Sequence, residues 1–389
     1  MARKLWAKRG LAALATGTMA VSLAACGGGG AGAGGGGGAG DGEEGGLVGV
    51  AMPTQTYERW IADGDAVKTG LEEAGYDVDL QFAGDDIPTQ QQQIDAMINK
   101  GAEALIIASI DGTALGSQLE AAAAADIPVI SYDRLIRDSE NVDFYVTFDN
   151  YEVGVQQGTS LLTGLGILGE DGEPAADAPE GPFNIELFAG SPDDNNAGFF
   201  FDGAMSVLQP YIDDKTLVVP SEQTAFKTVA IQRWEQETAQ ERMENLLTST
   251  YTKGDTKIDG VLAPADVLSR GIITALSNAG YGKGDLEMPI ITGQDAEAAS
   301  AKLIVDGDQY STIFKDTRLL AEQAVVAATA FLEGNEPEAN DTETYDNGEK
   351  VVPSFLLPTV IVTQDNLEAE LVESGYLTEE EVASGQVDE

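Results

Sequence analysis

The sequence predicts an α/β protein made of two doubly wound lobes, each built on a parallel sheet. From residue 47 onward, short apolar runs alternate with longer stretches of helical pattern. This alternation is typical of right-handed βαβ units, in which helices cover both faces of a parallel sheet. There are about ten apolar runs, which is too many for one small doubly wound domain. A single (βα)8 barrel is the alternative fold.

The predicted strands are the apolar runs at residues 47–53, 78–83, 104–109, 128–132, 144–148, 183–188, 217–220, 260–264, 289–292 and 310–314. Helical candidates lie between them, at residues 59–74, 88–100, 112–125, 195–208, 238–250, 267–279 and 317–333. Residues 169–182 are rich in Gly, Pro and acidic side chains, and we expect them to form a surface excursion.

The charge of the chain excludes several classes of function. The 389 residues include 66 Asp and Glu, 21 Lys and Arg and no His, which gives a formal net charge of −45. Binding to nucleic acid needs clustered basic residues, and so does adhesion of a basic face to anionic lipids. The absence of His removes the commonest general base and metal ligand. We interpret the acidity as a solvated surface that favours solubility.

The N-terminal segment predicts export and attachment to a membrane. A basic opening precedes an apolar stretch at residues 11–25, which is short for a membrane span and typical of a signal peptide. The single cysteine, Cys26, follows directly and excludes an intrachain disulfide. The junction at residues 23–26 resembles the lipobox of bacterial lipoproteins, which implies a signal peptide at 1–25 and a lipid on Cys26. A plain secretory signal with an incidental cysteine is the alternative.

We expect residues 26–46 to comprise the lipidated Cys26 and a flexible glycine-rich tether, because a segment of this composition cannot form a core. The protein would then lie on the outer face of the cytoplasmic membrane, either in a periplasm or at the cell surface.

Polar clusters follow almost every predicted strand. In open parallel sheets, ligands bind in the crevice outside the carboxyl ends of the strands, and two facing lobes would direct these clusters into one cleft. Carboxylates, amides, basic groups and indoles form a suitable set for a sugar, whose hydroxyls they bond and whose C–H face an indole covers. A single Asp after a strand is more often a turn or helix cap, so this interpretation depends on recurrence. The clusters are at residues 52–60, 109–111, 132–134, 148–150, 191–196, 265–266, 293–295 and 314–316.

Several of these segments together resemble the xylose-binding and multiple-sugar-binding periplasmic receptors of bacterial ABC importers. The similarity runs from about residue 47 to residue 376. The segments are Ala-Ser-Ile-Asp-Gly-Thr (108–113), Ser-Tyr-Asp-Arg-Leu-Ile-Arg (131–137), Thr-Phe-Asp-Asn (147–150), Gly-Ser-Pro-Asp-Asp-Asn-Asn-Ala (190–197), Gly-Gln-Asp-Ala (293–296) and Ser-Thr-Ile-Phe-Lys-Asp-Thr (311–317).

The resemblance implies a type I periplasmic-binding-protein fold, with two lobes joined by three crossovers. Lobe 1 would comprise residues 47–148 and 316–353, and lobe 2 residues 149–315 and 354–389. Phe199 and Phe200 are expected to add a wall to the site, and the segment 233–235 resembles the one whose Trp covers the sugar ring. The implied ligand contacts are Arg59, Trp60, Asp111, Asp133, Arg134, Asp194, Asn196, Trp234, Asp266, Asp295 and Lys315.

By the same resemblance, the protein is expected to be a receptor and not an enzyme. It would bind a monosaccharide of the xylose, glucose or galactose class, close by hinge motion and deliver the sugar to the membrane subunits of an ABC importer. At residues 263–266 the relatives vary between Asn and Asp, so the preferred hydroxyl stereochemistry is not predicted. We expect a monomer without a cofactor. We also expect no metal, because the sequence contains no complete calcium loop of the kind that galactose receptors carry.

Three alternatives differ in class. A sugar sensor for a signalling or chemotaxis partner would use the same ligand chemistry. A carbohydrate-active hydrolase would use two of the carboxylates as acid and base, but no pair stands out. A sugar-responsive transcription regulator would need a basic helix-turn-helix at the N-terminus, where this chain has the predicted export signal.

Overall fold

The computed structural model describes residues 45–251 and 256–387, which belong to one compact unit. The predicted signal peptide, the lipid on Cys26 and most of the tether lie outside the described residues. Gly45 and Gly46, which we assigned to the tether, already belong to the first strand. Within the described ranges, no helix combines the length and hydropathy that a membrane span requires.

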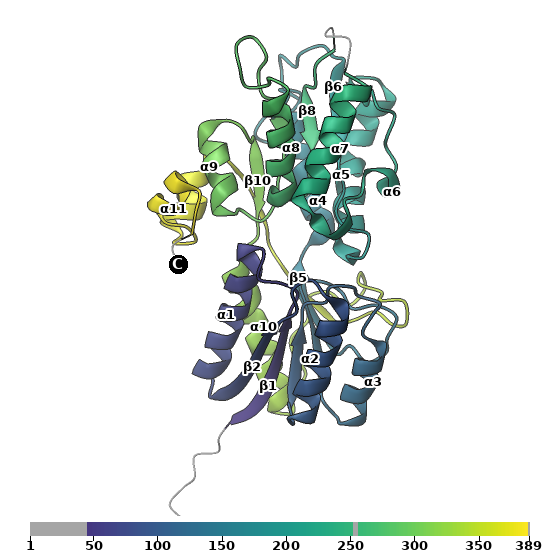
Figure 1. Ribbon diagram of the computed structural model, residues 1–389, viewed down its shortest axis with the longest axis vertical. Coiled ribbons are helices and arrows are strands. Elements are labelled where there is room, and N and C mark those ends of the chain that lie inside the picture. The colour runs from purple at the N-terminus through teal and green to yellow at the C-terminus, as the bar shows by residue number, and fades with distance from the viewer. Residues whose placement is uncertain (1–44, 252–255, 388–389) are drawn as a thin grey trace, which may run out of the picture. The chain divides into compact units, whose positions relative to one another are not determined.

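The first sheet has six strands in the order β11-β5-β4-β3-β1-β2, and all of its pairs are parallel. Side chains of β1 alternate between its faces: Val48 and Val50 pack with α1 and α10, whereas Ala51 packs with α2 and α3. Helices therefore cover both faces of this sheet (Figure 1). The strands are β1 (Gly45–Met52), β2 (Tyr76–Phe82), β3 (Ala104–Ile107), β4 (Val129–Tyr132), β5 (Phe144–Phe148) and β11 (Ser354–Leu357), and the helices are α1 (Glu58–Glu73), α2 (Ile87–Asn99), α3 (Gly116–Ala124) and α10 (Thr317–Leu332).

The second sheet has four strands in the order β7-β6-β8-β9, again all parallel. Leu161 of α4 and Leu208 of α5 pack on one of its faces, and Met243 of α7 and Leu268 of α8 on the other. The strands are β6 (Phe183–Leu187), β7 (Leu217–Val218), β8 (Gly260–Leu262) and β9 (Ile290–Ile291), and the helices are α4 (Asn150–Gly164), α5 (Asn195–Asp213), α7 (Gln236–Ser249) and α8 (Asp266–Asn278).

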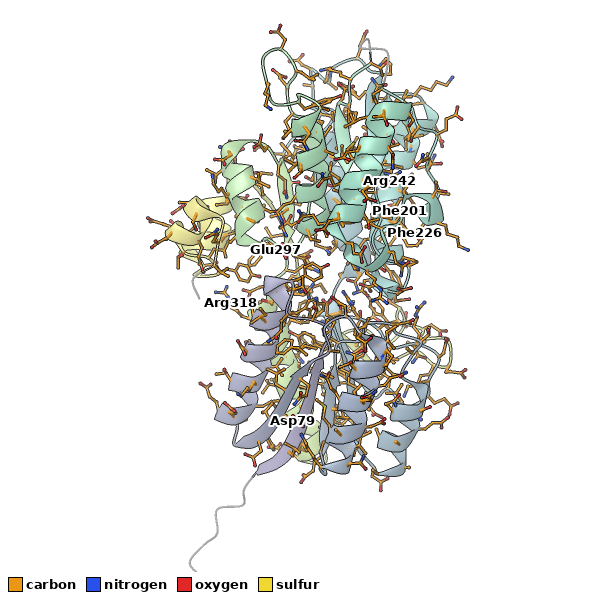
Figure 2. The ribbon with its side chains drawn as sticks, viewed as in Figure 1. Asp79, Phe201, Phe226, Arg242, Glu297 and Arg318 are labelled. Atoms are coloured by element: carbon orange, nitrogen blue, oxygen red, sulfur yellow. The ribbon has the colours of Figure 1, made fainter. Side chains whose placement is uncertain are left out.

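Smaller elements complete the second part of the chain. The ring of Phe201 in α5 meets that of Phe226 in α6 edge-on, with centroids 5.7 Å apart (Figure 2). The strands β10 and β12 form an antiparallel pair beside the second sheet. These elements are α6 (Phe226–Val229), the 3₁₀ turn η1 (Gln232–Trp234), α9 (Ala298–Asp306), β10 (Ser311–Phe314), β12 (Val360–Thr363), the π-helical turn η2 (Glu368–Glu373) and α11 (Glu379–Ser384).

The chain passes between the two parts three times: from β5 to α4, from β10 to α10 and from β11 to β12. This is the type I periplasmic-binding-protein fold, and the predicted fold class is confirmed. We call the part built on the first sheet lobe 1 (residues 45–148 and 317–357) and the part built on the second sheet lobe 2 (residues 150–314 and 358–387).

One predicted boundary differs from the structure. We expected the chain to return to lobe 2 at residue 354, but β11 pairs with β5 and so belongs to the first sheet. The reason is the burial of an apolar side chain, because Leu357 packs into the core of lobe 1 together with α1 and α10. The third crossover therefore begins after residue 357.

Candidate ligand-binding site

A cavity lies where residues of lobe 1 and lobe 2 meet, at the carboxyl ends of the strands. It encloses about 510 Å³ of empty space, part of which is open to solvent. Side chains from both lobes and from the second crossover line it: Tyr57, Arg59, Trp60, Asp133, Arg134, Asp194, Asn196, Phe200, Trp234, Ala265, Val267, Gln294, Asp295, Glu297 and Lys315.

Nine of the eleven predicted ligand contacts line this cavity, and two do not. The polar clusters that follow the strands thus come together at one cavity, and which side chains contact a ligand stays a prediction. The nine are Arg59, Trp60, Asp133, Arg134, Asp194, Asn196, Trp234, Asp295 and Lys315, and the two outside are Asp111 and Asp266.

The side chain of Asp111 stabilises the turn to which Asp111 belongs. Its carboxylate accepts hydrogen bonds of 2.8 Å from both the backbone N–H and the hydroxyl of Thr113. A carboxylate that bonds the backbone two residues on is the usual Asx arrangement after a strand. The structure therefore places Asp111 outside the cavity, with its Oδ1 atom bonded within its own turn.

Asp266 is completely buried behind the cavity wall. Its carboxylate accepts hydrogen bonds from the Gln309 amide (2.8 Å), the Thr312 hydroxyl (3.1 Å) and the Glu297 backbone N–H (3.1 Å). Its own N–H donates to the carbonyl of Gln294. Asp266 therefore holds the loop at residues 293–297, which carries Asp295. Burial, reinforced by the charge of Glu297, raises the pKa of Asp266 to about 8.

A chain of ion pairs forms the charged wall. Arg59, in the first turn of α1, bonds Asp63 one turn later (3.2 Å), Asp295 of lobe 2 (3.2 Å) and Asp133. Lys315 also bonds Asp295, at 2.9 Å. Burying charges is costly unless they are paired, and here the cations and carboxylates satisfy one another.

These pairs also set the charge of the carboxylates. Burial pushes the pKa of Asp133 upward, but Arg59 and Lys315 outweigh it, so the pKa of this carboxyl lies below its usual value. For Asp194 burial dominates, and its pKa is raised although Arg134 lies 3.4 Å away.

Two tryptophans, one from each lobe, provide flat apolar surfaces. The guanidinium carbons of Arg59 and Arg134 lie 4.8 and 5.0 Å from the ring centre of Trp60. Trp234 meets Phe200 edge-on, with ring centroids 6.3 Å apart.

Phe200 thus forms part of the wall as expected. Phe199 does not line the cavity, and its ring packs 5.3 Å from that of Tyr345.

Trp234 depends on a glycine for its place. A Cβ atom on Gly190 would lie 2.0 Å from the indole Cη2 atom and within 2.6 Å of two further ring atoms. The indole therefore lies directly against the backbone of Gly190, a position that no larger residue allows.

Three cavity residues hold left-handed backbone conformations, which non-glycine residues rarely adopt. The φ angles are 60° at Asp133, 58° at Trp234 and 99° at Asp295. Such conformations cost on the order of 1–3 kcal/mol each and concentrate at functional sites. Their presence in two lobes around one cavity indicates that the fold keeps these side chains directed at a common point.

The wall on lobe 2 contains polar atoms without partners. Among the described residues, neither the Trp234 Nε1–H nor the Gln294 Oε1 makes a hydrogen bond, although both are buried. A buried polar atom without a partner costs about 1–3 kcal/mol. A polar ligand in the cavity would supply a hydrogen-bond acceptor for the indole and a donor for the amide.

The sequence reasoning missed five lining residues: Tyr57, Ala265, Val267, Gln294 and Glu297. Gln294 lies within a polar cluster that we singled out, so its position gave a signal. Glu297 lies in the loop that precedes α9 (Figure 2) and forms a 2.5 Å ion pair with Arg270. Its role in the wall depends on the path of that loop, which the sequence does not reveal.

The cavity is equipped to bind a small polar molecule by hydrogen bonds and aromatic contact. Donors and acceptors surround it on several sides, and its Asp133 and Asp295 carboxylates are tied to cations. Within residues 45–251 and 256–387, no group of three or more potential metal ligands comes together. Fold and cavity are those of a two-lobed binding protein, with a cavity between the lobes at the place where parallel sheets usually hold ligands.

Comparison with known proteins identifies the family. Residues 48–336 match the family described as periplasmic binding protein domain, and the chain belongs to this family. It is 54% identical to the multiple sugar-binding periplasmic receptor of Rhizobium radiobacter, over 85% of this chain and 90% of that protein. It is 36% identical to the D-xylose-binding periplasmic protein of Escherichia coli K12, over 86% and 92% of the two chains.

Solved structures agree with these relatives. An ABC transporter solute-binding protein from Clostridium phytofermentans with bound β-D-glucose matches with a TM-score of 0.80 and 46% identity, over 86% of this chain and 99% of that chain. A carbohydrate transporter solute-binding protein from Chloroflexus aurantiacus in complex with D-glucose matches with a TM-score of 0.75 and 37% identity, over 86% and 97%.

Proposed function

We propose that the protein is an exported receptor that binds one monosaccharide of the xylose, glucose or galactose class between its lobes. The observation that carries this proposal is a cavity with a tryptophan from each lobe and with interleaved carboxylates, amides and cations. It is supported by relatives that are named for sugars and by the two similar structures that contain glucose.

In this proposal, different side chains of the cavity make different kinds of contact with the sugar. Carboxylates that are already tied to Arg59 and Lys315 accept hydrogen bonds from sugar hydroxyls, and the free N–H groups of these cations donate to hydroxyl oxygens. The Trp234 indole covers the C–H face of the ring. Gln294 contributes its Oε1 acceptor, which has no partner among the described residues.

Binding is coupled to hinge closure in this proposal. A sugar that contacts both lobes stabilises the conformation in which they are closed. The three crossovers are the only connections along the described chain between the two lobes, and they supply the hinge. The closed receptor then delivers its sugar to the membrane subunits of an ABC importer, without acting as an enzyme.

The proposal includes the setting of the receptor. It is a monomer, held on the outer face of the cytoplasmic membrane by a lipid on Cys26. Service as the sugar-binding partner of a signalling or chemotaxis receptor is the second candidate, because closure would present the same surface to either partner. A hydrolase is disfavoured, because Asp133 and Asp295 share the same arginine and neither is a free acid or base.

Thermal unfolding of residues 45–389 in the presence of candidate ligands tests this function. We would compare xylose, glucose, galactose, arabinose and ribose with leucine. A ligand that binds only the folded protein adds about 2.7 kcal/mol at 100 times its dissociation constant, which raises the unfolding midpoint by several degrees. A shift with one or two aldoses and none with leucine is the expected result. If no sugar shifts the midpoint of ligand-free protein, the proposed ligand class is wrong.

A further inference from the structure

A buried polar cluster joins the lobes beside the cavity. The hydroxyl of Tyr145, in β5 of lobe 1, lies 2.7 Å from the carbonyl oxygen of Asp133 and 2.9 Å from Oδ1 of Asn196. Asn196 belongs to the first turn of α5 in lobe 2. All three residues are at most 4% exposed. The hydrogen bonds by which this cluster connects the lobes are therefore buried.

The side-chain amide of Asn196 is bonded at both ends by groups of lobe 1. Its Nδ2–H donates to the carbonyl of Asp133 at 2.6 Å, and its Oδ1 accepts from the Tyr145 hydroxyl. The Asp133 carbonyl also accepts from the hydroxyl of Thr147, at 3.0 Å. The two bonds of Asn196 exist only while α5 is in contact with lobe 1, whereas the Thr147 bond lies within lobe 1.

The cluster extends to the first crossover. The amide of Asn150, at the start of α4, lies 3.4 Å from both the Tyr145 and the Thr147 hydroxyls. A rotation of lobe 2 about this crossover would move Asn150 and Asn196 relative to Tyr145. The hydroxyl is therefore placed where hinge motion changes its bonds.

Tyr145 itself does not line the cavity. Its ring is fully buried in the core of lobe 1 and meets the ring of Tyr345 edge-on, with centroids 5.0 Å apart. Any influence of its hydroxyl on ligand binding must therefore pass through Asp133 and Asn196, which do line the cavity.

We propose that Tyr145 is a positioning residue whose hydroxyl stabilises the closed arrangement of the lobes independently of the sugar bound. The inference rests on the proposed function, in which closure accompanies sugar binding. A residue that shifts the closed population changes the apparent affinity for every ligand by the same factor, whereas a residue that touches the sugar changes the ratio between ligands.

The variant Tyr145→Phe removes one oxygen and keeps the packing of the ring. We expect the dissociation constants for glucose, xylose and galactose, measured by calorimetry, to rise together by about three- to tenfold, as for the loss of one buried hydrogen bond. The ratios between sugars should stay as in the wild type. Unchanged dissociation constants, or a change in their ratios, would overturn the proposal.

Tyr251→Phe is the matched control. Tyr251 is also buried, and its hydroxyl donates to Glu186 at 2.7 Å within lobe 2, with neither residue at the cavity. This variant loses the same atom and should bind all three sugars as the wild type does. Thr147→Val removes the hydroxyl that holds the Asp133 carbonyl, which is the acceptor for the Asn196 amide of lobe 2, and should repeat the effect of Tyr145→Phe in weaker form. It provides the test if Tyr145→Phe does not fold.

A measurement without sugar separates this inference from the proposed function. Spin labels at Glu73→Cys in lobe 1 and Glu244→Cys in lobe 2, in the full chain with Cys26→Ser, report the distance between the lobes. Both positions are exposed on helices. Tyr145→Phe should shift the ligand-free distance distribution toward that of an opened protein, and Tyr251→Phe should not. Identical distributions for Tyr145→Phe and the wild type would refute the role of Tyr145, even if no tested sugar bound.

Discussion

The two tryptophans of the cavity are held in opposite ways. Trp60 of lobe 1 lies in the core beside two guanidinium groups, and the charged groups around it are ion-paired. Trp234 of lobe 2 lies against Gly190, in a left-handed conformation, with an indole N–H that has no partner among the described residues. The difference teaches that Trp60 is held by charged groups that pair with one another across the lobes, whereas Trp234 is held by backbone contact and keeps an unused hydrogen-bond donor for a ligand.

The largest effect should follow from displacing Trp234. In Gly190→Ala, the new Cβ would occupy the place of the indole, so the ring must leave the cavity. We expect sugar affinity to fall on the order of a hundredfold, since an aromatic surface of this size is lost from the site. Calorimetric titration with the preferred sugar measures this. Gly198→Ala is the matched control, because a Cβ there meets no atom within 4 Å. Equal affinities for the two variants would show that Trp234 does not carry binding.

Breaking the ion pairs that join the lobes comes next. Asp295→Ala removes the carboxylate that bonds both Arg59 and Lys315, and Arg134→Ala removes the cation beside Asp194. Each variant should cost about 1.5–3 kcal/mol of binding free energy, as for buried hydrogen bonds to charged groups. The ratio of dissociation constants for glucose, galactose and xylose should also change. If both variants bound these sugars as the wild type does, the assignment of the charged wall would be wrong.

The next effect is on stability and concerns the support of the lobe 2 wall by Asp266. Its pKa is raised from 3.8 to about 8 in the folded protein, so the folded state holds a proton that the unfolded state loses. The contribution of this group to stability is therefore fully present below about pH 4 and declines as the pH rises toward 8. Urea unfolding of wild type and Asp266→Asn across this range measures it. The stability of the wild type relative to the variant should fall with increasing pH, and a constant difference would contradict the assigned pKa.

The smallest effect is expected at Asp111. Asp111→Ala should leave sugar affinity unchanged, because this carboxylate bonds its own turn and lies outside the cavity. The loss of the turn bonds should lower the free energy of unfolding by about 1 kcal/mol or less. Calorimetry and urea unfolding measure the two quantities. A large loss of affinity would return Asp111 to the set of ligand contacts.

Much of the fold and the position of the candidate cavity could be predicted from the sequence. Strand–helix alternation gave two parallel sheets, and polar clusters after the strands gave the cavity. The sequence did not show which individual carboxylates line the cavity. Asp111, Asp266 and Asp295 all follow predicted strands, yet only Asp295 reaches the cavity. Their difference depends on which backbone and side-chain donors approach each carboxylate, and those donors come from other segments of the chain.

Other features left no pattern that the sequence reasoning could use. Tyr145 appears in the sequence as one apolar residue in a buried strand, and its hydroxyl acquires a role only because α5 brings Asn196 beside it. Gly190 is one of 46 glycines, and its need to be small follows from the position of Trp234. In both residues, the role depends on a contact with a segment that is distant in the sequence.

The pairing of β11 with β5 has a consequence for folding during protein synthesis. Ribosomes release the N-terminal part first, so the segment that forms β1 to β5 emerges long before residues 354–357 do. Until then the Phe144–Phe148 strand is the edge of a five-stranded sheet, with an unpaired row of backbone groups and an apolar sequence. Exposed edges of this kind are prone to pair with other chains. A nascent or truncated chain that ends before residue 354 would therefore be vulnerable to aggregation, and a chaperone that shields this edge during synthesis would protect it until its last partner strand arrives.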